Sequence, residues 1–322
     1  MVPREKLGTL TPLVSVVIPS RNRADMLREA LDSVIRQTYR EFEVIVVDDG
    51  SRDHTRDVAS TYDDRIRYIY QESRGRSEAR NSGVLASKGE YVAFLDDDDV
   101  WYPRKLDLQV AVLDHNRDVD VVYGAAVLVG EGSRDLLSAE LPPPDSLLER
   151  LISSKWIMPA AASVLMVRRT ALERSGLFDR TVEPFEDWEL WVRLAASGAG
   201  FAQLREPLAE YRMHESNSLR DREFMLAGHL AALEKILGSP GTPASIRTRR
   251  NHYLSRGWLF AGNQRYVDAQ VGPALEAWCR AVRLDPSVFT PRLLAVMVKS
   301  LLGPRLLTWA RVAKRDLMSL RS

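Results

Sequence analysis

The chain has 322 residues, enough for one large core and a smaller second unit, because single cores stop growing near about 250 to 300 residues. Hydrophobic residues make up 45% and charged residues 28%, and the formal net charge is +1, which argues against bulk electrostatic binding of nucleic acid. The single cysteine excludes an internal disulfide, and no segment approaches the roughly 18 uninterrupted apolar residues of a membrane-spanning helix. We therefore expect a cytoplasmic, globular protein.

The first half of the chain alternates short apolar runs with segments whose apolar residues recur at helical spacing. The apolar runs predict strands at residues 13–18, 43–47, 65–70 and 91–95. The helical spacing predicts helices at residues 26–35, 51–60, 77–87 and 103–115. Strands that alternate with helices and are apolar almost throughout indicate an α/β fold, with a mostly parallel, Rossmann-like sheet and helices on both faces.

Polar segments follow each of these strands. Because parallel sheets bind ligands beyond the carboxyl ends of their strands, we expect one rim to gather residues 19–23, 48–51, 74–76 and 96–99. The last segment is a run of four aspartates, which on its own favours a solvated turn. Adjacent like charges repel one another unless water or a cation neutralises them. Because acidic residues follow two separate strands, at residues 48–49 and 96–99, we favour a divalent-metal site.

The second half predicts further strands at residues 119–129, 162–168 and 208–213, a helix that ends near residue 153, and a helix from Glu186. After Asp221 the pattern is helical throughout, with helices expected at residues 221–237, 243–262, 266–284, 287–302 and 304–320. Residues 274–286 resemble the second helix of a tetratricopeptide repeat, although stable arrays need about three stacked repeats. We therefore predict a domain at residues 1–220 and a helical region at residues 221–322, with a single repeat-like hairpin.

The C-terminal tail is rich in basic residues. Apolar residues at helical spacing lie beside Arg305, Arg311, Lys314 and Arg315, a composition suited to an anionic membrane surface. Packing onto the preceding helices is the competing interpretation, and it ranks slightly ahead. Our hypothesis is peripheral association with the inner face of the membrane, where the acceptor would be lipid-linked.

Several ordered motifs between residues 13 and 218 resemble family 2 glycosyltransferases. They lie at residues 14–23, 43–53, 71–75, 79–83 and 89–99, and continue through Trp101, Pro103, Lys105 and Leu106. The resemblance implies a GT-A fold and an inverting transfer of one sugar from a nucleotide-diphosphate sugar to an acceptor hydroxyl. A UDP-sugar is the expected donor, a saccharide or lipid-linked molecule the acceptor, and cell-surface polysaccharide or glycoconjugate synthesis the setting.

The resemblance also implies donor-side roles. Asp98 would bind Mn²⁺ or Mg²⁺, hard cations that take carboxylate and phosphate oxygens, although four consecutive aspartates leave Asp97 open as the ligand. Arg80 would reach the base or the diphosphate, unless it is a surface cation on a helix. The remaining donor-binding residues implied are Pro19, Arg21, Asp48 or Asp49, Gly75, Asp96 and Asp97.

On the acceptor side, the resemblance makes Asp187 the general base, because an inverting displacement needs one carboxylate opposite the leaving diphosphate. A capping role at a helix N-terminus is the alternative and is compatible with it. Glu186 and Trp188 would lie beside the acceptor, although the helical spacing of Trp188 favours the interior. His214 would close over the diphosphate or complete the metal shell; the alternative is a structural histidine.

Two other functions compete. A sugar-1-phosphate nucleotidyltransferase needs a glycine-rich triphosphate loop after the first strand, and residues 19–23 contain no glycine. A non-catalytic nucleotide-sugar-binding scaffold should have lost some of its carboxylates, which are intact here. The Gln-x-x-Arg-Trp motif of processive synthases is absent, so we expect single-sugar transfer, and the sequence leaves homo-oligomerisation open.

Overall fold

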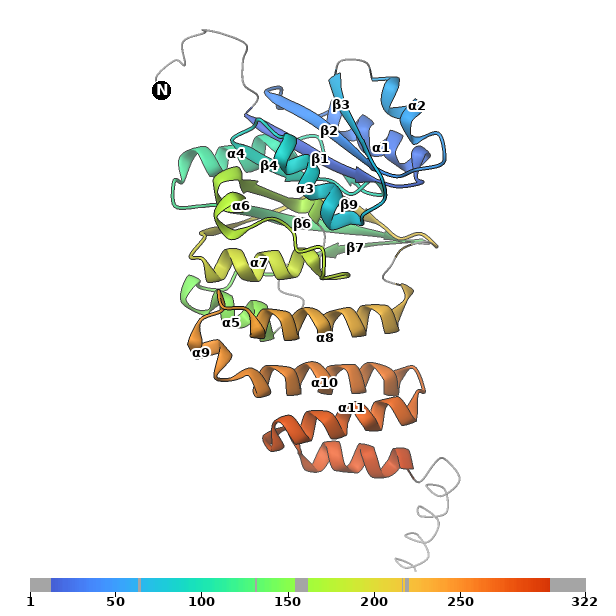
Figure 1. Ribbon diagram of the computed structural model, residues 1–322, viewed down its shortest axis with the longest axis vertical. Helices are drawn as coiled ribbons and strands as arrows, with labels where there is room; N and C mark the ends of the chain where they lie inside the picture. Colours follow the sequence, from blue (N-terminus) through green and yellow to red (C-terminus); the bar gives the residue numbers. More distant parts are fainter. Residues whose placement is uncertain are drawn as a thin grey trace, which may run out of the picture. The chain divides into compact units, whose positions relative to one another are not determined.

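The computed structural model describes residues 13–62, 65–130, 132–153, 162–215, 217 and 220–301. Contacts divide the chain into two compact units, Met1–Pro243 and Ala244–Ser322. The first is an α/β unit and the second is helical, so the predicted fold class is confirmed (Figure 1). Among the described residues, no helix is both long and apolar enough to cross a membrane. The predicted helix at residues 304–320, with its basic side chains, lies outside the described residues.

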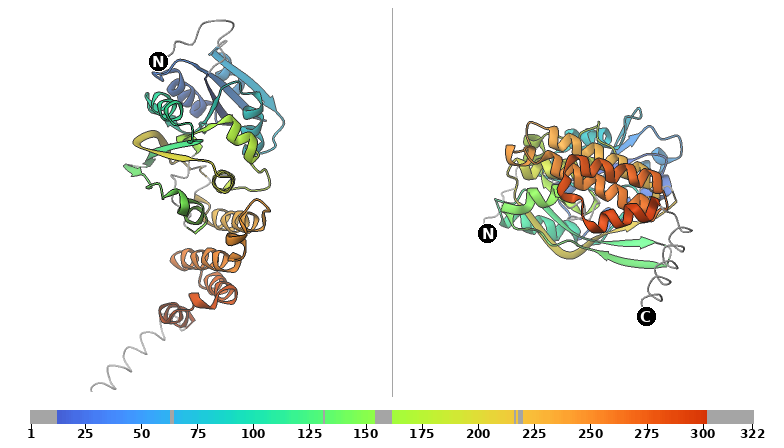
Figure 2. Two further views of the ribbon diagram at one scale, coloured as in Figure 1. Left: turned by 90° about the vertical axis from the view of Figure 1, so that its left-hand side faces the viewer. Right: turned by 90° about the horizontal axis from the view of Figure 1, so that it is seen from below.

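Four parallel strands form the first part of the sheet, in the order β3-β2-β1-β4. The strands are β1 (Val14–Ser20), β2 (Phe42–Asp49), β3 (Ile66–Gln71) and β4 (Tyr91–Phe94). The helices between them are α1 (Ala24–Ile35), α2 (Thr55–Ser60) and α3 (Arg76–Ala86). Every residue of β1 is buried, so both faces of the sheet are covered there (Figure 2). Gly83 lets α3 approach β1, because a Cβ at this position would lie 2.3 Å from Val17 Cγ1.

The rest of the sheet combines parallel and antiparallel pairs. After β4 the order continues β8-β6-β9-β5, and β7 pairs with β6 off this path. The strands are β5 (Val100–Trp101), β6 (Val121–Gly130), β7 (Ser133–Leu137), β8 (Leu165–Arg168) and β9 (Phe201–Arg212). The helices of this part are α4 (Lys105–His115), α5 (Pro144–Ser153), α6 (Arg169–Ser175), α7 (Glu186–Ala196) and α8 (Arg222–Gly238).

Three elements of this part were not predicted, and one begins earlier than predicted. Strand β9 starts at Phe201 rather than residue 208. Its first four residues are half-buried and the next three are exposed, so no buried face marks this part of the strand in the sequence. Strand β7 is exposed along its whole length, so no buried face marks it in the sequence. The two-residue β5 and the short α6 fall below the length at which periodicity is informative.

The predicted domain boundary at residues 220 and 221 precedes α8, whereas the contacts place α8 in the first unit. The reason is packing against α7 and the segment that leads into it. His229 of α8 stacks on Trp188 with ring centroids 5.1 Å apart, and a Cβ on Gly228 would lie 2.3 Å from Pro184 Cδ.

The second unit is built from packed helices. They are α9 (Ala244–Arg247), α10 (Arg250–Val267), α11 (Val271–Leu284), the short η4 (Pro286–Val288) and a further helix at residues 291–301. Trp278 of α11 is buried against α10, where Gly262 leaves room for its ring. Small residues therefore set the spacing of this helix pair, as the repeat-like pattern predicts.

Candidate active site

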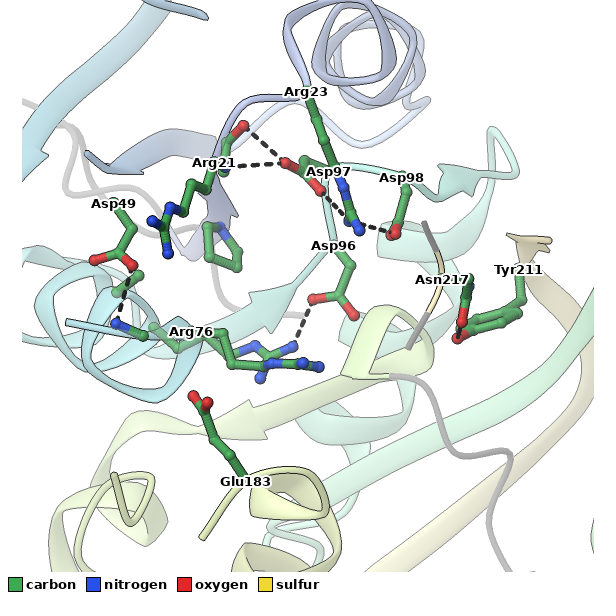
Figure 3. Close-up of a pocket in the computed structure, with 15 residues that line it drawn as sticks. Arg21, Arg23, Asp49, Arg76, Asp96, Asp97, Asp98, Glu183, Tyr211 and Asn217 are labelled. Carbon is green, nitrogen blue, oxygen red and sulfur yellow. Dashed lines mark hydrogen bonds and ion pairs between the residues drawn. The ribbon is translucent and has the colours of Figure 1, made fainter. Parts of the chain in front are cut away.

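A cavity of about 350 Å³ lies at the carboxyl end of the parallel strands (Figure 3). It gathers polar segments that follow β1, β2, β3 and β4, as expected for a parallel sheet. The predicted donor-side residues that line it are Pro19, Arg21, Asp49, Gly75, Arg80, Asp96, Asp97 and Asp98. Asp48, Glu186, Asp187, Trp188 and His214 are not among its lining residues.

The four aspartates after β4 point in different directions. Asp96, Asp98 and Asp99 each place one carboxylate oxygen near the other two residues, and these three oxygens lie within 4.8 Å of one another. Asp97 turns instead toward the loop after β1, where it accepts hydrogen bonds from Ser20 Oγ at 2.8 Å and from the backbone N–H of Arg21 at 3.3 Å. The candidate metal ligands are therefore Asp96, Asp98 and Asp99, and Asp97 is not part of this triad.

The pKa values of the carboxyl groups in this cluster shift in opposite directions, although burial raises each of them. Burial and the neighbouring Asp98 raise the pKa of Asp97 to about 7. Burial, Asp98 and Asp96 likewise hold the pKa of Asp99 well above its ordinary value. Burial acts in the same direction on Asp96, but Arg80 outweighs it and lowers the pKa of Asp96. The four carboxyl groups outnumber the two arginines that pair with them, Arg23 and Arg80, so the cluster fits a divalent cation.

Side chains outside the acidic run fix its remaining oxygens. Ser163 Oγ donates to Asp99 Oδ2 at 2.5 Å and accepts from the backbone N–H of Asp96 at 3.1 Å. His214 Nε2 lies 2.9 Å from Asp98 Oδ2, so the predicted metal-shell histidine does reach the acidic run. Arg212 Nε donates to the backbone carbonyl of Asp98 at 2.5 Å. Strand β9 and the residues after it therefore contact the acidic run at Asp98.

Arg80 is a buried bridge between the acidic run and α7. Its side chain is 4% exposed, so the interpretation as a surface cation is wrong. Its Nη2 donates to Asp96 Oδ1 and its Nη1 to Glu186 Oε1, each at 2.6 Å, and its guanidinium lies 5.3 Å from the centre of the Phe178 ring. It lines the cavity and also joins the two halves of the site.

Asp49, rather than Asp48, faces the cavity. Its carboxylate accepts from the backbone N–H groups of Arg74 at 2.8 Å and Gly75 at 2.9 Å, which shapes the loop before α3. Gly75 adopts a positive φ of 91°, and a Cβ there would approach Glu183 to 2.9 Å. Asp48 is buried and accepts from Tyr68 Oη at 2.5 Å. Of the two predicted base or ribose contacts, only Asp49 is therefore placed to touch a ligand in this cavity.

The first turn of α7 carries the predicted acceptor-side residues. Asp187 Oδ1 accepts from the backbone N–H of Trp188 at 2.7 Å, which is consistent with the capping interpretation. Burial and the adjacent Glu186 raise the pKa of Asp187 to about 7, against the opposing effect of Arg80. Trp188 is buried and donates its indole N–H to the Leu151 carbonyl at 2.9 Å, so it lies in the core, as its spacing favours.

Several lining residues had no predicted role. They are Ser20, Arg23, Arg76, Ala79, Glu183, Tyr211 and Asn217. Figure 3 labels Arg23, Arg76, Glu183, Tyr211 and Asn217. Ser20, Arg23 and Arg76 lie within two of the segments expected at the rim, which was the available signal. Glu183, Tyr211 and Asn217 come from loops or strand ends far along the chain, where no local pattern links them to the acidic run.

Comparison with known proteins agrees with this geometry. The profile of Glycosyl transferase family 2 matches residues 15–176. An uncharacterised glycosyltransferase of Rickettsia typhi is 34% identical over 245 residues, which is 71% of this chain and 75% of the relative. A Bacillus subtilis protein whose name assigns it provisionally to teichuronic acid biosynthesis, TuaG, is 31% identical over 67% of this chain and 84% of its own length.

Solved structures share the fold. Residues 1–349 of Staphylococcus aureus TarS, in complex with UDP-GlcNAc, superpose with a TM-score of 0.63 at 20% identity, covering 94% of this chain and 88% of that chain. This chain spans 53% of the longer TarS structure. The mannosyltransferase PcManGT of Pyrobaculum calidifontis, in complex with GDP-Man and Mn²⁺, gives a TM-score of 0.59 at 22% identity over 92% of this chain and 83% of that chain.

The family profile and the curated relatives define the class of protein as a glycosyltransferase. The chain belongs to glycosyltransferase family 2.

Proposed function

We propose that the protein transfers one sugar, with inversion, from a UDP-sugar to an acceptor hydroxyl in cell-surface polysaccharide or glycoconjugate synthesis, with Mn²⁺ or Mg²⁺ as cofactor. The observation that carries the proposal is the convergence of Asp96, Asp98 and Asp99 within 4.8 Å beside the cavity. UDP-GlcNAc bound to the similar TarS fold supports the choice of nucleotide, and the likeness to TuaG supports the setting.

The donor's nucleoside would occupy the part of the cavity bordered by Pro19, Arg21, Asp49 and Gly75. Asp49 fixes the backbone of the loop that contains Gly75, so the surface that receives the base is formed before the donor arrives. Asp96, Asp98 and Asp99, with His214 adjacent to Asp98, would hold the divalent cation. When bound, the cation neutralises negative charge on the leaving diphosphate.

Asp187 would act as the base on the acceptor side. The acceptor oxygen forms a bond to the anomeric carbon while the bond from that carbon to the diphosphate oxygen breaks, and the hydroxyl proton moves to the Asp187 carboxylate. A pKa of about 7 suits this task, because the group is ionised near neutral pH and still accepts a proton in the transition state. Arg80 would position this half of the site, since it holds Glu186 next to Asp187 and Asp96 across the cavity.

A donor panel tests the proposal. Thermal shifts would be measured with Mn²⁺ and a set of UDP-, GDP- and dTDP-sugars, and positive donors would be assayed for nucleotide release with saccharide and lipid-linked acceptors. We expect one UDP-sugar to stabilise the protein beyond UDP alone, because only a true donor adds contacts to the sugar. Pyrophosphate release from a nucleoside triphosphate and a sugar phosphate would contradict the proposal and favour a nucleotidyltransferase.

Peripheral membrane association is a separable part of the proposal. It is supported by the basic and apolar composition of residues 304–320 and by the hydrophobic character that a lipid-linked acceptor would have. Full-length protein should sediment with anionic vesicles at low salt and less with neutral ones. Equal sedimentation with both would contradict this part and leave the catalytic proposal intact.

A further inference from the structure

Arg23 contacts two carboxylates of the acidic run through one nitrogen. Its Nη1 lies 3.0 Å from Asp97 Oδ1 and 2.5 Å from Asp98 Oδ2, and it reaches them from the loop between β1 and α1 (Figure 3). A cation that bridges two carboxylates in this way does what a bound metal does in an acidic site. Asp98 also belongs to the triad whose oxygens converge, so Arg23 and a metal would compete for the same carboxylate.

The two arginines at the acidic run differ in how firmly they are held. Arg80 is 4% exposed, is anchored a second time by Glu186 at 2.6 Å, and packs beside Phe178. The Arg23 side chain is 28% exposed, and among the described residues its guanidinium pairs with Asp97 and Asp98 alone. Arg80 is thus fixed by three groups, whereas Arg23 can leave when a stronger cation neutralises Asp98.

A released Arg23 would remain in the cavity that the proposed function assigns to the donor. The cavity is lined by Arg23 itself and by Arg21 and Arg76, and a diphosphate is a ligand that a guanidinium binds through two parallel hydrogen bonds. The same guanidinium can therefore pair with the Asp98 carboxylate before the ligands bind and with the diphosphate afterwards.

We infer that Arg23 is an exchangeable counter-ion: it occupies Asp98 when no metal is bound, is displaced by the divalent cation, and then contacts the diphosphate of the donor. The inference rests on the proposed function. It explains why a second arginine faces the acidic run at Asp98 although Arg80 already pairs with Asp96. It also predicts opposite effects of one substitution on metal and nucleotide affinity.

Mn²⁺ affinity without nucleotide tests the first half. Free Mn²⁺ would be titrated by electron paramagnetic resonance against the full chain and the variants Arg23→Gln, Arg23→Lys and Arg21→Gln. We expect Arg23→Gln to bind Mn²⁺ about tenfold more tightly than wild type, the order of magnitude of one charge-assisted hydrogen bond. Arg21→Gln is the matched control: it removes the same charge from the cavity, but among the described residues its guanidinium pairs with no carboxylate.

Nucleotide affinity tests the second half. At saturating Mn²⁺, Arg23→Gln should bind UDP about tenfold more weakly than wild type, because the diphosphate loses a guanidinium contact. Unchanged UDP affinity would overturn the contact with the diphosphate. A purely structural Arg23 would lower the melting temperature without strengthening Mn²⁺ binding, so this result would overturn the exchange.

The outcomes also separate this inference from the proposed function. If wild type binds Mn²⁺ and UDP, but Arg23→Gln binds Mn²⁺ no more tightly than wild type, the inference is overturned and the proposed function stands. If no variant binds Mn²⁺, both the exchange and the proposed metal site are overturned. Should Arg23→Gln fail to fold by circular dichroism, Arg23→Lys carries the test, with tighter Mn²⁺ binding than wild type expected because the shorter lysine side chain holds its charge farther from the two carboxylates.

Discussion

The rim of the sheet and the helical unit bury very different side chains. At the rim, Asp97, Asp98, Asp99, Arg80 and Glu186 are all buried. In α10 and α11 the buried positions are almost all apolar, and Ser255 is the polar residue buried in these two helices. Burying charge costs free energy unless each group is paired, whereas burying apolar surface stabilises the fold. The rim therefore depends on paired charges, whereas the helix pair depends on apolar packing.

The proposed base should give the strongest change in rate. Asp187→Asn should lower the transfer rate about 10³-fold, because a positioned base contributes roughly 10² to 10⁴. Nucleotide affinity should stay within about twofold, since Asp187 does not line the cavity. Rates of donor-dependent UDP release and calorimetric UDP binding would measure the two quantities. Asp25→Asn is the control, because its carboxylate is highly exposed; an unchanged rate in Asp187→Asn would remove this residue from the mechanism.

Arg80→Met tests whether the rim depends on paired charge. Loss of the guanidinium leaves Asp96 and Glu186 without their closest cation, so we expect a loss of about 3 to 5 kcal/mol in the free energy of unfolding. Urea denaturation would measure it. Arg76→Met, a half-exposed cavity arginine 3.7 Å from Glu186, should cost less than about 1 kcal/mol. If Arg80→Met is as stable as wild type and only UDP binding weakens, Arg80 is a donor contact rather than a bridge.

Gly262→Ala tests packing in the helical unit. The new Cβ would lie 2.4 Å from Trp278 Cδ1, so we expect a loss of about 1 to 3 kcal/mol despite the better helix propensity of alanine. Gly272→Ala provides the comparison without a clash, because its new Cβ would meet no atom within 4 Å; it lies in the first turn of α11, before Pro273, so its gain in helix propensity is smaller. Circular dichroism during urea unfolding would report both. Equal stability of the two variants would show that small residues do not set the spacing of α10 and α11.

The pH dependence should be the smallest effect. Since the pKa of Asp187 is raised to about 7, the rate should fall about tenfold per pH unit below 7 as the base becomes protonated. The contribution of Asp187 to stability has the opposite sign. Its folded-state pKa lies above the unfolded value of about 3.9, so that contribution is present below pH 4 and is lost as the pH rises to 7. A profile of kcat that is flat between pH 5.5 and 8 would contradict this assignment.

Much of the rim was predictable because strand ends in a parallel sheet meet at one edge. The apolar run before Asp96 and the run before Asp48 and Asp49 were enough to place these carboxylates near one another. The sequence could not distinguish Asp48 from Asp49, because that depends on which side of β2 each faces. It also left Asp97 and Asp98 as alternative ligands, since a run of four identical residues does not show which aspartate aligns with the metal ligand of the family motif.

The remaining features depend on contacts between distant segments. Arg80 pairs with Glu186, 106 positions along the chain, and no local pattern announces that pair. Arg23 contacts Asp98 through a side chain whose direction follows from the loop after β1. Strand β7 and the first residues of β9 are formed by pairing with β6 rather than by a buried face of their own, so periodicity could not reveal them.

Calorimetric UDP affinity with and without Mn²⁺ shows whether the acidic run binds the donor together with a divalent cation. In wild type, Mn²⁺ should strengthen UDP binding by about tenfold or more, because a cation held by Asp98 also attracts the negatively charged diphosphate. In Asp98→Asn the strengthening should fall to about twofold or less. Equal strengthening in both proteins, or none in wild type, would contradict the account.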